Sequence, residues 1–293
     1  MSGAREEKVP HGLLHAFLAA VVLYTLYPVL WVVTIAFSGK QSLAIADLPA
    51  QPAFLDRLRA VTPWPATWST ANFVSVFGDQ PFARWMLNSV IVAVATTLVG
   101  VFLSCTAAYA FSRFKFPGRR TGMMAFLVSQ MFPGVLTLIP LYIIIVQWLG
   151  LGSTRLGLVV VYATTSIPFS VWMLKGYFDT IPKELEEAAI IEGAGPGMIF
   201  WRIVMPLAMP AVAITALFSF MTAWNEFILA ATFMDQEAMY TAPVGLKFFV
   251  GGFQQQWGYF AAGSILVSIP VVALFLFLQK YLVSGLTAGS DKG

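Results

Sequence analysis

The sequence predicts an all-α, polytopic membrane protein with six transmembrane helices. Hydrophobic residues make up 58% of the 293 residues and charged residues 11%, and the mean hydropathy is +0.78. A soluble domain carries about 25% charged residues, so too little polar material is present to cover a soluble fold. Six apolar stretches are each long enough to cross roughly 30 Å of hydrocarbon as a helix. They are residues 13–37, 86–112, 122–148, 156–175, 207–233 and 259–283.

The first stretch, residues 13–37, is interpreted as a retained span rather than a signal peptide. It is longer than a typical signal-peptide apolar region, and no small-residue cleavage motif follows it.

The distribution of lysine and arginine predicts the orientation of the chain. Six spans place both ends on one side, and that side carries eleven of the seventeen Lys and Arg residues. By the positive-inside rule, residues 1–12, 176–206 and 284–293 are cytoplasmic. Residues 38–85 and 235–258 are then extracytoplasmic. This topology accounts for the pI near 9.0 without a nucleic-acid partner.

The two extracytoplasmic segments differ in composition. Trp64, Trp68 and Phe73 indicate that the first segment is a folded cap rather than a loose linker. The second contains Gly251-Gly252 and a run of glutamines. It is either an ordinary connector or a loop that reaches a partner outside the membrane.

The cytoplasmic segment 176–206 is unusually charged for this chain and predicts two short helices. Thr180 is expected to cap the first helix, and Gly193 is expected to end it in a left-handed conformation. A second helix begins at Gly195-Pro196 and ends before Pro206, whose ring is expected to start the next span.

Two interpretations of this helix pair are possible. It either lies as a hairpin on the lipid surface or inserts into a groove of a partner protein. Five acidic side chains oppose three basic ones between residues 175 and 202, and an anionic leaflet repels that charge. Small residues at Ala188, Ala189 and Gly193 allow close approach of a partner, and Glu187 is placed to meet an arginine there. A protein groove is therefore favoured.

The spacing of these residues resembles the EAA loop of binding-protein-dependent ABC importer permeases. Glu187-Ala188-Ala189 is followed after three residues by Gly193, and after nine more by Ile203-x-x-Pro206. Met205 is the one departure, since the family usually has leucine there. The resemblance implies that the docking residues for a separate ATPase are Glu187, Ala188, Ala189, Gly193, Ile203 and Pro206.

Other segments narrow the resemblance to the MalG-type subunit of carbohydrate-uptake permeases, from Asn72 onward. The segments are Asn72-Phe73, Asn88-Ser89, Ala108 to Arg113, Phe116-Pro117-Gly118, Trp224 to Phe227, and Gly285 to Gly289. This resemblance implies the type I ABC importer permease fold. It also implies transport of a sugar: maltose or maltodextrin first, with trehalose and other oligosaccharides or glycosides as alternatives.

The resemblance further implies the partners of this subunit. They are a second permease of the MalF type, two MalK-type ATPase subunits, an extracytoplasmic sugar-binding protein and the bilayer of a prokaryotic cytoplasmic membrane. The chain lacks a phosphate-binding loop, since Gly39-Lys40 has no upstream glycine in register. No cofactor is therefore expected on this chain, and the ATPase subunits are expected to bind ATP and magnesium. The tail 284–293 either contacts the ATPase or frays.

Polar and aromatic residues within the apolar stretches are candidates for the sugar pathway. An ionisable group inside a membrane is costly and usually faces a cavity or a partner, which singles out Glu226. Its alternative role is a hydrogen bond between packed helices. Pro133 and Pro140 are expected to interrupt the third span. The candidate pathway residues are Gln130, Tyr142, Trp224, Asn225 and Glu226.

Two other classes of membrane protein were weighed against an importer subunit. A membrane enzyme or metal site needs a cluster of catalytic or ligating side chains, and the spans contain none in the sequence. An ion-coupled secondary transporter needs buried carboxylates, and only Glu226 is expected at depth. The secondary transporter stays as the alternative.

Overall fold

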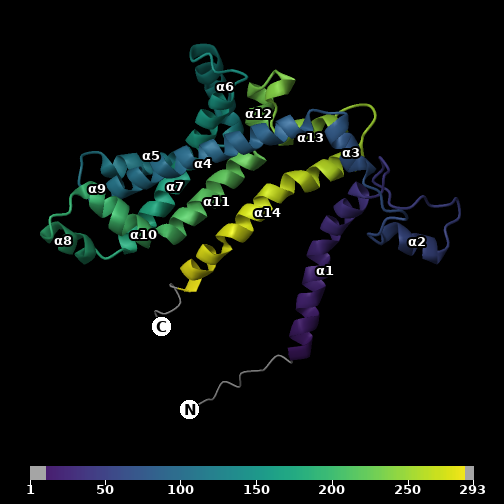
Figure 1. Ribbon diagram of the computed structural model, residues 1–293, viewed down its shortest axis with the longest axis horizontal. Helices are drawn as coiled ribbons and strands as arrows, with labels where there is room; N and C mark the ends of the chain where they lie inside the picture. The colour runs from purple at the N-terminus through teal and green to yellow at the C-terminus, as the bar shows by residue number, and fades with distance from the viewer. Residues whose placement is uncertain (1–10, 288–293) are drawn as a thin grey trace. The chain divides into compact units, whose positions relative to one another are not determined.

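The computed structural model describes residues 11–287, and the side chains of these residues as far as 279. All regular structure in this range is helical, which confirms the predicted all-α fold (Figure 1). Two compact units are present. One lies within residues 1–80 and 246–266, and the other within residues 81–245 and 267–293.

Four helices are each long and apolar enough to cross a membrane, and two bent helix pairs raise the number to six. The four are α1 (His11–Ala36), α4 (Phe82–Arg113), α7 (Arg155–Thr180) and α14 (Trp257–Thr287). The bent pairs are α5 (Arg119–Ser129) with the segment Gly134–Trp148, and the segment Pro196–Leu207 with α11 (Met209–Asn225). These segments correspond to the six predicted stretches.

The third predicted span is not a single helix. Its two halves meet at an angle of 103°, and Pro133 precedes the second half, α6 (Gly134–Tyr142). Proline has no N–H and disfavours helical geometry in the residue before it, which explains the break. Pro140 remains inside α6. A π-helical segment, η1 (Ile143–Trp148), follows directly.

The start of the fifth span also differs from the prediction. Pro206 lies inside a helical run that comprises α9 (Pro196–Ile199), the π-helical η2 (Phe200–Val204) and α10 (Met205–Leu207). The span helix α11 begins at Met209, after a bend of 81°. The prediction that Pro206 starts the span is therefore wrong, because the helix before it continues through the proline. The predicted stretch to residue 233 also divides, since extended backbone at Glu226 separates α11 from α12 (Ile228–Phe233).

Residues 37–80 form a folded cap, as the aromatic residues predicted. The ring of Phe37 lies 5.6 Å from that of Trp68 and 4.8 Å from that of Phe73, and Trp64 meets Trp68 edge-on at 5.2 Å. Asn72 donates hydrogen bonds of 3.3 and 3.0 Å to the last two carbonyls of α1. The cap contains two short helices, α2 (Phe54–Val61) and α3 (Ala71–Gly78).

In the larger unit, α4, α7 and α11 pack together along a seam of small residues (Figure 1). A Cβ added at Gly100 would lie 3.2 Å from the Ser219 hydroxyl and 3.5 Å from the Ser166 hydroxyl. Small residues allow helices to approach closely where lipid offers no hydrophobic drive for association. The buried polar members of the seam are Thr96, Ser104, Ser166, Ser170, Thr215 and Ser219.

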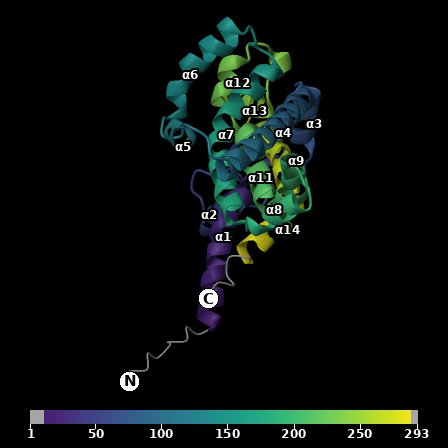
Figure 2. The ribbon, with the colours of Figure 1, turned by 90° about the vertical axis from the view of Figure 1, so that its left-hand side faces the viewer.

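Apolar clusters lie on either side of this seam. One gathers around Leu158, Trp224 and Phe233, and the other around Leu174 and Phe200. Helices α6 and α12 lie at one end of the unit and α8 (Glu184–Ile191) at the opposite end in both views (Figures 1 and 2).

The segment after α12 is held against the outer end of α4. The amide of Asn88 donates to the carbonyls of Ala238 and Tyr240 at 3.0 and 2.9 Å and accepts from Arg155 Nε at 2.9 Å. The hydroxyl of Ser89 accepts from the N–H of Ala242 at 2.8 Å. The beginning of the segment predicted to be extracytoplasmic is therefore ordered, through η3 (Glu237–Met239) and the start of α13 (Ala242–Val250).

Substitution of Gly245 tests the packing of α13 on α4. A Cβ at this position would lie 2.0 Å from the ring of Trp85, which is fully buried and donates its indole N–H to Glu237 O. Gly245→Ala is expected to lower the thermal stability of the purified permease, by about 1–3 kcal/mol for overpacking. Gly176→Ala is the control, because no atom lies within 4 Å of its added Cβ. Equal melting temperatures for the two variants would contradict this packing.

Candidate docking surface and substrate pathway

Helix α8 ends where the sequence predicts. Gly193 has φ of 90°, in the left-handed region. Its N–H donates to Ile190 O at 2.9 Å, and the N–H of Ala194 donates to Ala189 O at 2.9 Å. Glycine adopts this conformation without the Cβ clash that other residues meet. The predicted helix stop is confirmed.

The start of α8 differs from the prediction. Thr180 is the last residue of α7, and its hydroxyl donates back to Tyr177 O at 2.7 Å. The cap position of α8 is Lys183, and Ile181 between the two helices is extended. The predicted cap at Thr180 is therefore wrong, because α7 continues five residues beyond residue 175, where the predicted apolar stretch ends. The second short helix, α9, does begin at Pro196 as predicted.

A buried ion pair attaches α8 to the end of α4. Arg113 Nε lies 2.5 Å from Glu186 Oε1, with side-chain exposures of 7% and 10%. The other carboxylate oxygen accepts from the hydroxyl of Tyr109 at 3.3 Å. Arg113 Nη2 also donates to Ile181 O at 3.1 Å. A buried pair of this kind is stable only when its remaining hydrogen-bonding groups are satisfied, as they are here.

A second polar link joins α4 to α7 beside this pair. The hydroxyl of Ser112 donates to Asp179 Oδ1 at 2.6 Å and accepts from Arg113 Nη1 at 2.8 Å. Lys175 Nζ lies 2.5 Å from Asp179 Oδ2. The C-terminal ends of α4 and α7 and the start of α8 are therefore connected by one network.

Sequence reasoning did not identify this network. The prediction for Glu187 concerns an arginine of a partner protein and stays a prediction. Within the chain, Glu186 pairs with Arg113, and Glu187 is exposed. The sequence does indicate which face of α8 is buried. Glu186 and Ala189 are three residues apart and therefore share a helix face. In the structure, both are buried. The position of Arg113 could not be read from its spacing, because it lies 73 residues earlier in the chain.

The opposite face of α8 is exposed and partly apolar. Glu187 and Ala188 are exposed, and so are Ile190 at 59% and Ile191 at 88%. A Cβ at Gly193 would meet no atom within 4 Å, so this position is open. Leu185, Met198 and Trp201 extend the apolar surface.

The six predicted docking residues therefore divide into two groups. Glu187, Ala188, Gly193 and Pro206 are exposed. Ala189 and Ile203 pack against the apolar cluster around Phe200. Ala189 is buried in the core, whereas Leu185 and Ala188 are exposed, so the small residues at 188 and 189 do not lie on one exposed face.

One predicted pathway residue lines a polar cavity. Gln130 lies in the break between α5 and α6, beside a cavity of about 390 Å³. Its amide nitrogen lies 3.5 Å from Thr165 O. The polar lining residues are Ser129, Gln130, Thr137, Thr164 and Thr165, and no lining side chain is charged. Hydroxyl and amide groups of this kind bind uncharged polar ligands through hydrogen bonds.

Glu226 is engaged in a local cap. Its two carboxylate oxygens accept the N–H groups of Leu229 at 2.8 Å and Ala230 at 2.9 Å, at the start of α12. Such a cap satisfies backbone donors that have no partner within the helix. The polar contacts of this carboxylate therefore stabilise a helix start.

The remaining three pathway candidates are dispersed. Trp224 is 1% exposed and donates its indole N–H to Val267 O at 3.1 Å. Asn225 is exposed, with its amide bonded to Met221 O at 3.0 Å, and the half-buried ring of Tyr142 meets Phe233 edge-on. The structure thus does not bring the five candidates into one cavity.

Comparison with known proteins identifies the family. Residues 100–288 match the family described as "Binding-protein-dependent transport system inner membrane component". This chain belongs to that family of permeases. It is therefore a membrane subunit that is not itself an enzyme, and nucleotide is bound by the partner ATPase. The predicted location in the cytoplasmic membrane is confirmed.

Individual proteins are similar over almost the whole chain. MdxG of Bacillus subtilis, a maltodextrin transport system permease, is 34% identical over 280 residues, with 95% of each chain covered. SugB of Mycobacterium tuberculosis, a trehalose transport system permease, is 34% identical over 275 residues. The match covers 93% of this chain and 94% of SugB.

A solved structure supports the fold. One chain of a bacterial ABC transporter involved in alginate import has a TM-score of 0.77 and 22% identity, with 96% of this chain and 99% of that chain covered. The predicted ABC importer permease fold is confirmed.

Removing one partner of the buried ion pair tests the attachment of α8. Arg113→Met leaves the Glu186 carboxylate buried without its partner and is expected to cost about 3–5 kcal/mol. The double variant with Glu186→Met is expected to recover much of that loss in the melting temperature of the purified permease. Lys183→Met, at an exposed position, is the control. A single variant as stable as this control would contradict the contribution of the pair.

Proposed function

We propose that this chain is the MalG-type permease subunit of an ATP-driven importer of neutral oligosaccharides, with maltose or maltodextrin as the first candidate. The observation that carries the proposal is the exposed face of α8, which presents Glu187, Ala188 and Gly193 on a helix anchored to the span bundle. This arrangement is what an ATPase cleft requires: a protruding small-residue surface with a rigid base.

The proposed assembly contains this chain, a MalF-type permease, two MalK-type ATPase subunits and an extracytoplasmic sugar-binding protein. The family description supports the binding protein, since it names transport that depends on one. The absence of a phosphate-binding loop from the sequence supports separate ATPase subunits. The exposed Gly251 to Gln255 loop is the proposed contact for the binding protein.

Closure of the ATPase dimer would act on the spans through the polar network at the base of α8. A displacement of α8 passes to α4 through Arg113 and Glu186, and α7 follows through Asp179 and Ser112. Because Arg113 and Glu186 are paired and their side chains are about nine-tenths buried, moving α8 alone would break the ion pair. Moving the three helix ends together retains it, and alternating access follows from that joint movement.

The lining of the polar cavity supports a neutral sugar. Gln130, Thr164 and Thr165 offer amide and hydroxyl groups, and no charged side chain lines the cavity to select an ion. The names of similar permeases include maltodextrin and trehalose, which are both neutral sugars. Among these, maltodextrin is proposed because the Trp224 to Phe227 segment and the C-terminal segment resemble the MalG type.

The alternative, an ion-coupled secondary transporter, needs a carboxylate that can bind and release an ion or proton. The candidate for that role, Glu226, accepts two backbone N–H groups through its two oxygens. Protonation would weaken the cap of α12, so this carboxylate is poorly suited to that cycle.

A charged residue at Gly193 tests the docking role. Gly193→Asp introduces a branched, charged side chain on the docking surface, in a conformation that costs about 1 kcal/mol for a non-glycine residue. ATP-dependent uptake of labelled maltodextrin by reconstituted vesicles is expected to fall at least roughly tenfold, the loss expected from about 1.4 kcal/mol of docking energy. The amount of inserted permease should stay unchanged, since no atom lies within 4 Å of the new Cβ.

Gly197→Ala is the matched control, since its added Cβ also meets no atom and its φ is not positive. Undiminished uptake by Gly193→Asp would refute the docking role. Uptake driven by an ion gradient without ATP would favour the secondary transporter instead.

Substitution of Gln130 tests the polar cavity. Gln130→Ala removes an amide donor and acceptor, and the apparent KM for the transported sugar is expected to rise roughly fivefold for the loss of one hydrogen bond. Gln147→Ala is the control, because Gln147 is exposed and does not line this cavity. Initial uptake rates over a range of sugar concentrations measure both. The same KM in the two variants would exclude Gln130 from the pathway.

A further inference from the structure

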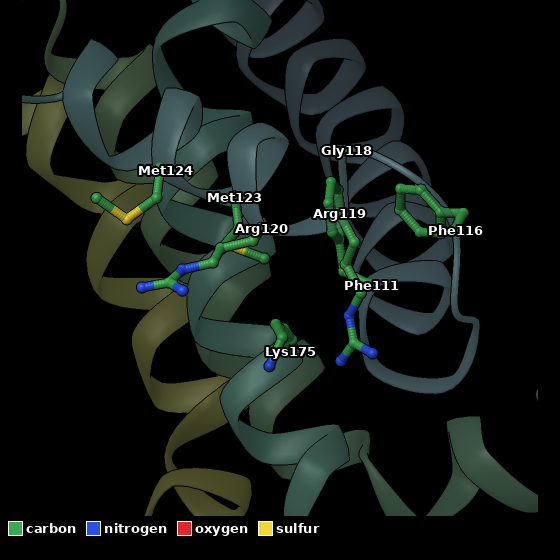
Figure 3. Close-up of a pocket in the computed structure, with 8 residues that line it drawn as sticks. All are labelled: Phe111, Phe116, Gly118, Arg119, Arg120, Met123, Met124 and Lys175. Carbon is green, nitrogen blue, oxygen red and sulfur yellow. The ribbon is translucent and has the colours of Figure 1, made fainter.

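A second cavity lies near the cytoplasmic ends of the spans, away from the docking surface and the polar cavity. It has a volume of about 530 Å³ and is formed by the end of α4, the start of α5 and the last part of α7 (Figure 3). Its apolar lining comes from Phe111, Phe116, Met123 and Met124. Flexible methionines and aromatic rings adapt to an apolar chain more readily than to a polar ligand.

Three cationic side chains line the same cavity. They are Arg119, Arg120 and Lys175; in Figure 3 the nitrogen atoms of Arg119 and Lys175 lie in the lower part of the view, and the guanidinium of Arg120 points to the left, below Met124. Lys175 is already paired with Asp179. Within residues 11–279, neither arginine has a carboxylate within 4 Å, and the one printed contact of Arg119 is a 3.4 Å bond to Phe114 O. Two positive charges are therefore available.

The cavity lies at the ends of three candidate membrane helices. Phe111 is in the last turn of α4, Arg119 is the first residue of α5, and Lys175 is in the last two turns of α7. All three helices are candidate spans or halves of one. The positive-inside distribution puts this end at the cytoplasmic leaflet, where anionic lipids attract Lys and Arg.

We propose that this cavity binds an anionic phospholipid of the cytoplasmic leaflet. Arg119 and Arg120 attract the anionic headgroup, and the first part of an acyl chain packs on Phe116, Met123 and Met124. Charge complementarity and the apolar lining select the same ligand, because only an amphipathic anion uses both. A free phosphate would leave the apolar lining without a partner, and an acidic peptide would contact only the arginines. Basic pockets between membrane helices on the cytoplasmic side bind anionic headgroups in this way.

Binding to the purified, assembled transporter tests this proposal. Native mass spectrometry with added phosphatidylglycerol is expected to show retained lipid, and phosphatidylcholine, which has no net charge, is expected to be lost. The double variant Arg119→Gln with Arg120→Gln is expected to weaken phosphatidylglycerol binding by roughly 25-fold, about fivefold for each cation. Lys115→Gln is the matched control, because Lys115 is exposed on the loop that precedes α5 and does not line the cavity. Its affinity should stay within about twofold of the unaltered protein, since no lipid contact is removed.

A third variant separates the cavity from general surface charge. Met123→Trp fills the cavity without changing charge, and it is expected to abolish phosphatidylglycerol retention while the complex still assembles. Retention by this variant, or unchanged phosphatidylglycerol affinity in the double arginine variant, would overturn the proposal. Competition by inorganic phosphate as strong as by the lipid would show a simple anion site and also overturn it. So would a photocrosslinker at position 120 that captures another subunit rather than lipid.

Discussion

The buried pair of Arg113 and Glu186 determines how the cytoplasmic helix α8 relates to the membrane bundle. Both side chains are about nine-tenths buried, and their remaining polar groups are bonded to Tyr109, Ser112 and the backbone. Separating them would leave a charge in an apolar setting, a larger cost than that of an exposed pair. Helix α8 is therefore firmly attached to α4, and a force on the exposed face of α8 also displaces α4. A loop without this attachment would move without displacing the spans.

Features that depend on local chemistry could be predicted from the sequence. The helix stop at Gly193 and the helix start at Pro196 follow from backbone preferences of glycine and proline, and both are present. Features that depend on the surrounding structure could not be predicted from the sequence. Thr180 could have capped a helix, but α7 includes it, and Pro206 lies within a helical run that contains the π-helical η2. The prolines of the third span indicated an interruption, while the angle of 103° depends on the packing of both halves.

The candidate sites show the same limit. Glu186 and Glu187 differ by about 100° around the helix, and which of them meets Arg113 depends on a residue far away in the sequence. Composition pointed to Gln130 and Trp224 equally as polar groups in apolar stretches. Only the fold shows that the indole N–H of Trp224 is taken by the carbonyl of Val267 while Gln130 reaches a cavity.

The seam between α4, α7 and α11 has a consequence for how the bundle can move. Around Gly100 the contact involves glycine and short hydroxyl side chains, with larger apolar residues on either side, and the hydroxyls of Thr96 and Ser104 have no partner among the described residues. A hydroxyl can rotate to a new acceptor after a shift of less than one helical turn, whereas large interlocking side chains must first disengage. Around Gly100 the seam therefore opposes separation of the three helices more strongly than it opposes sliding along their axes.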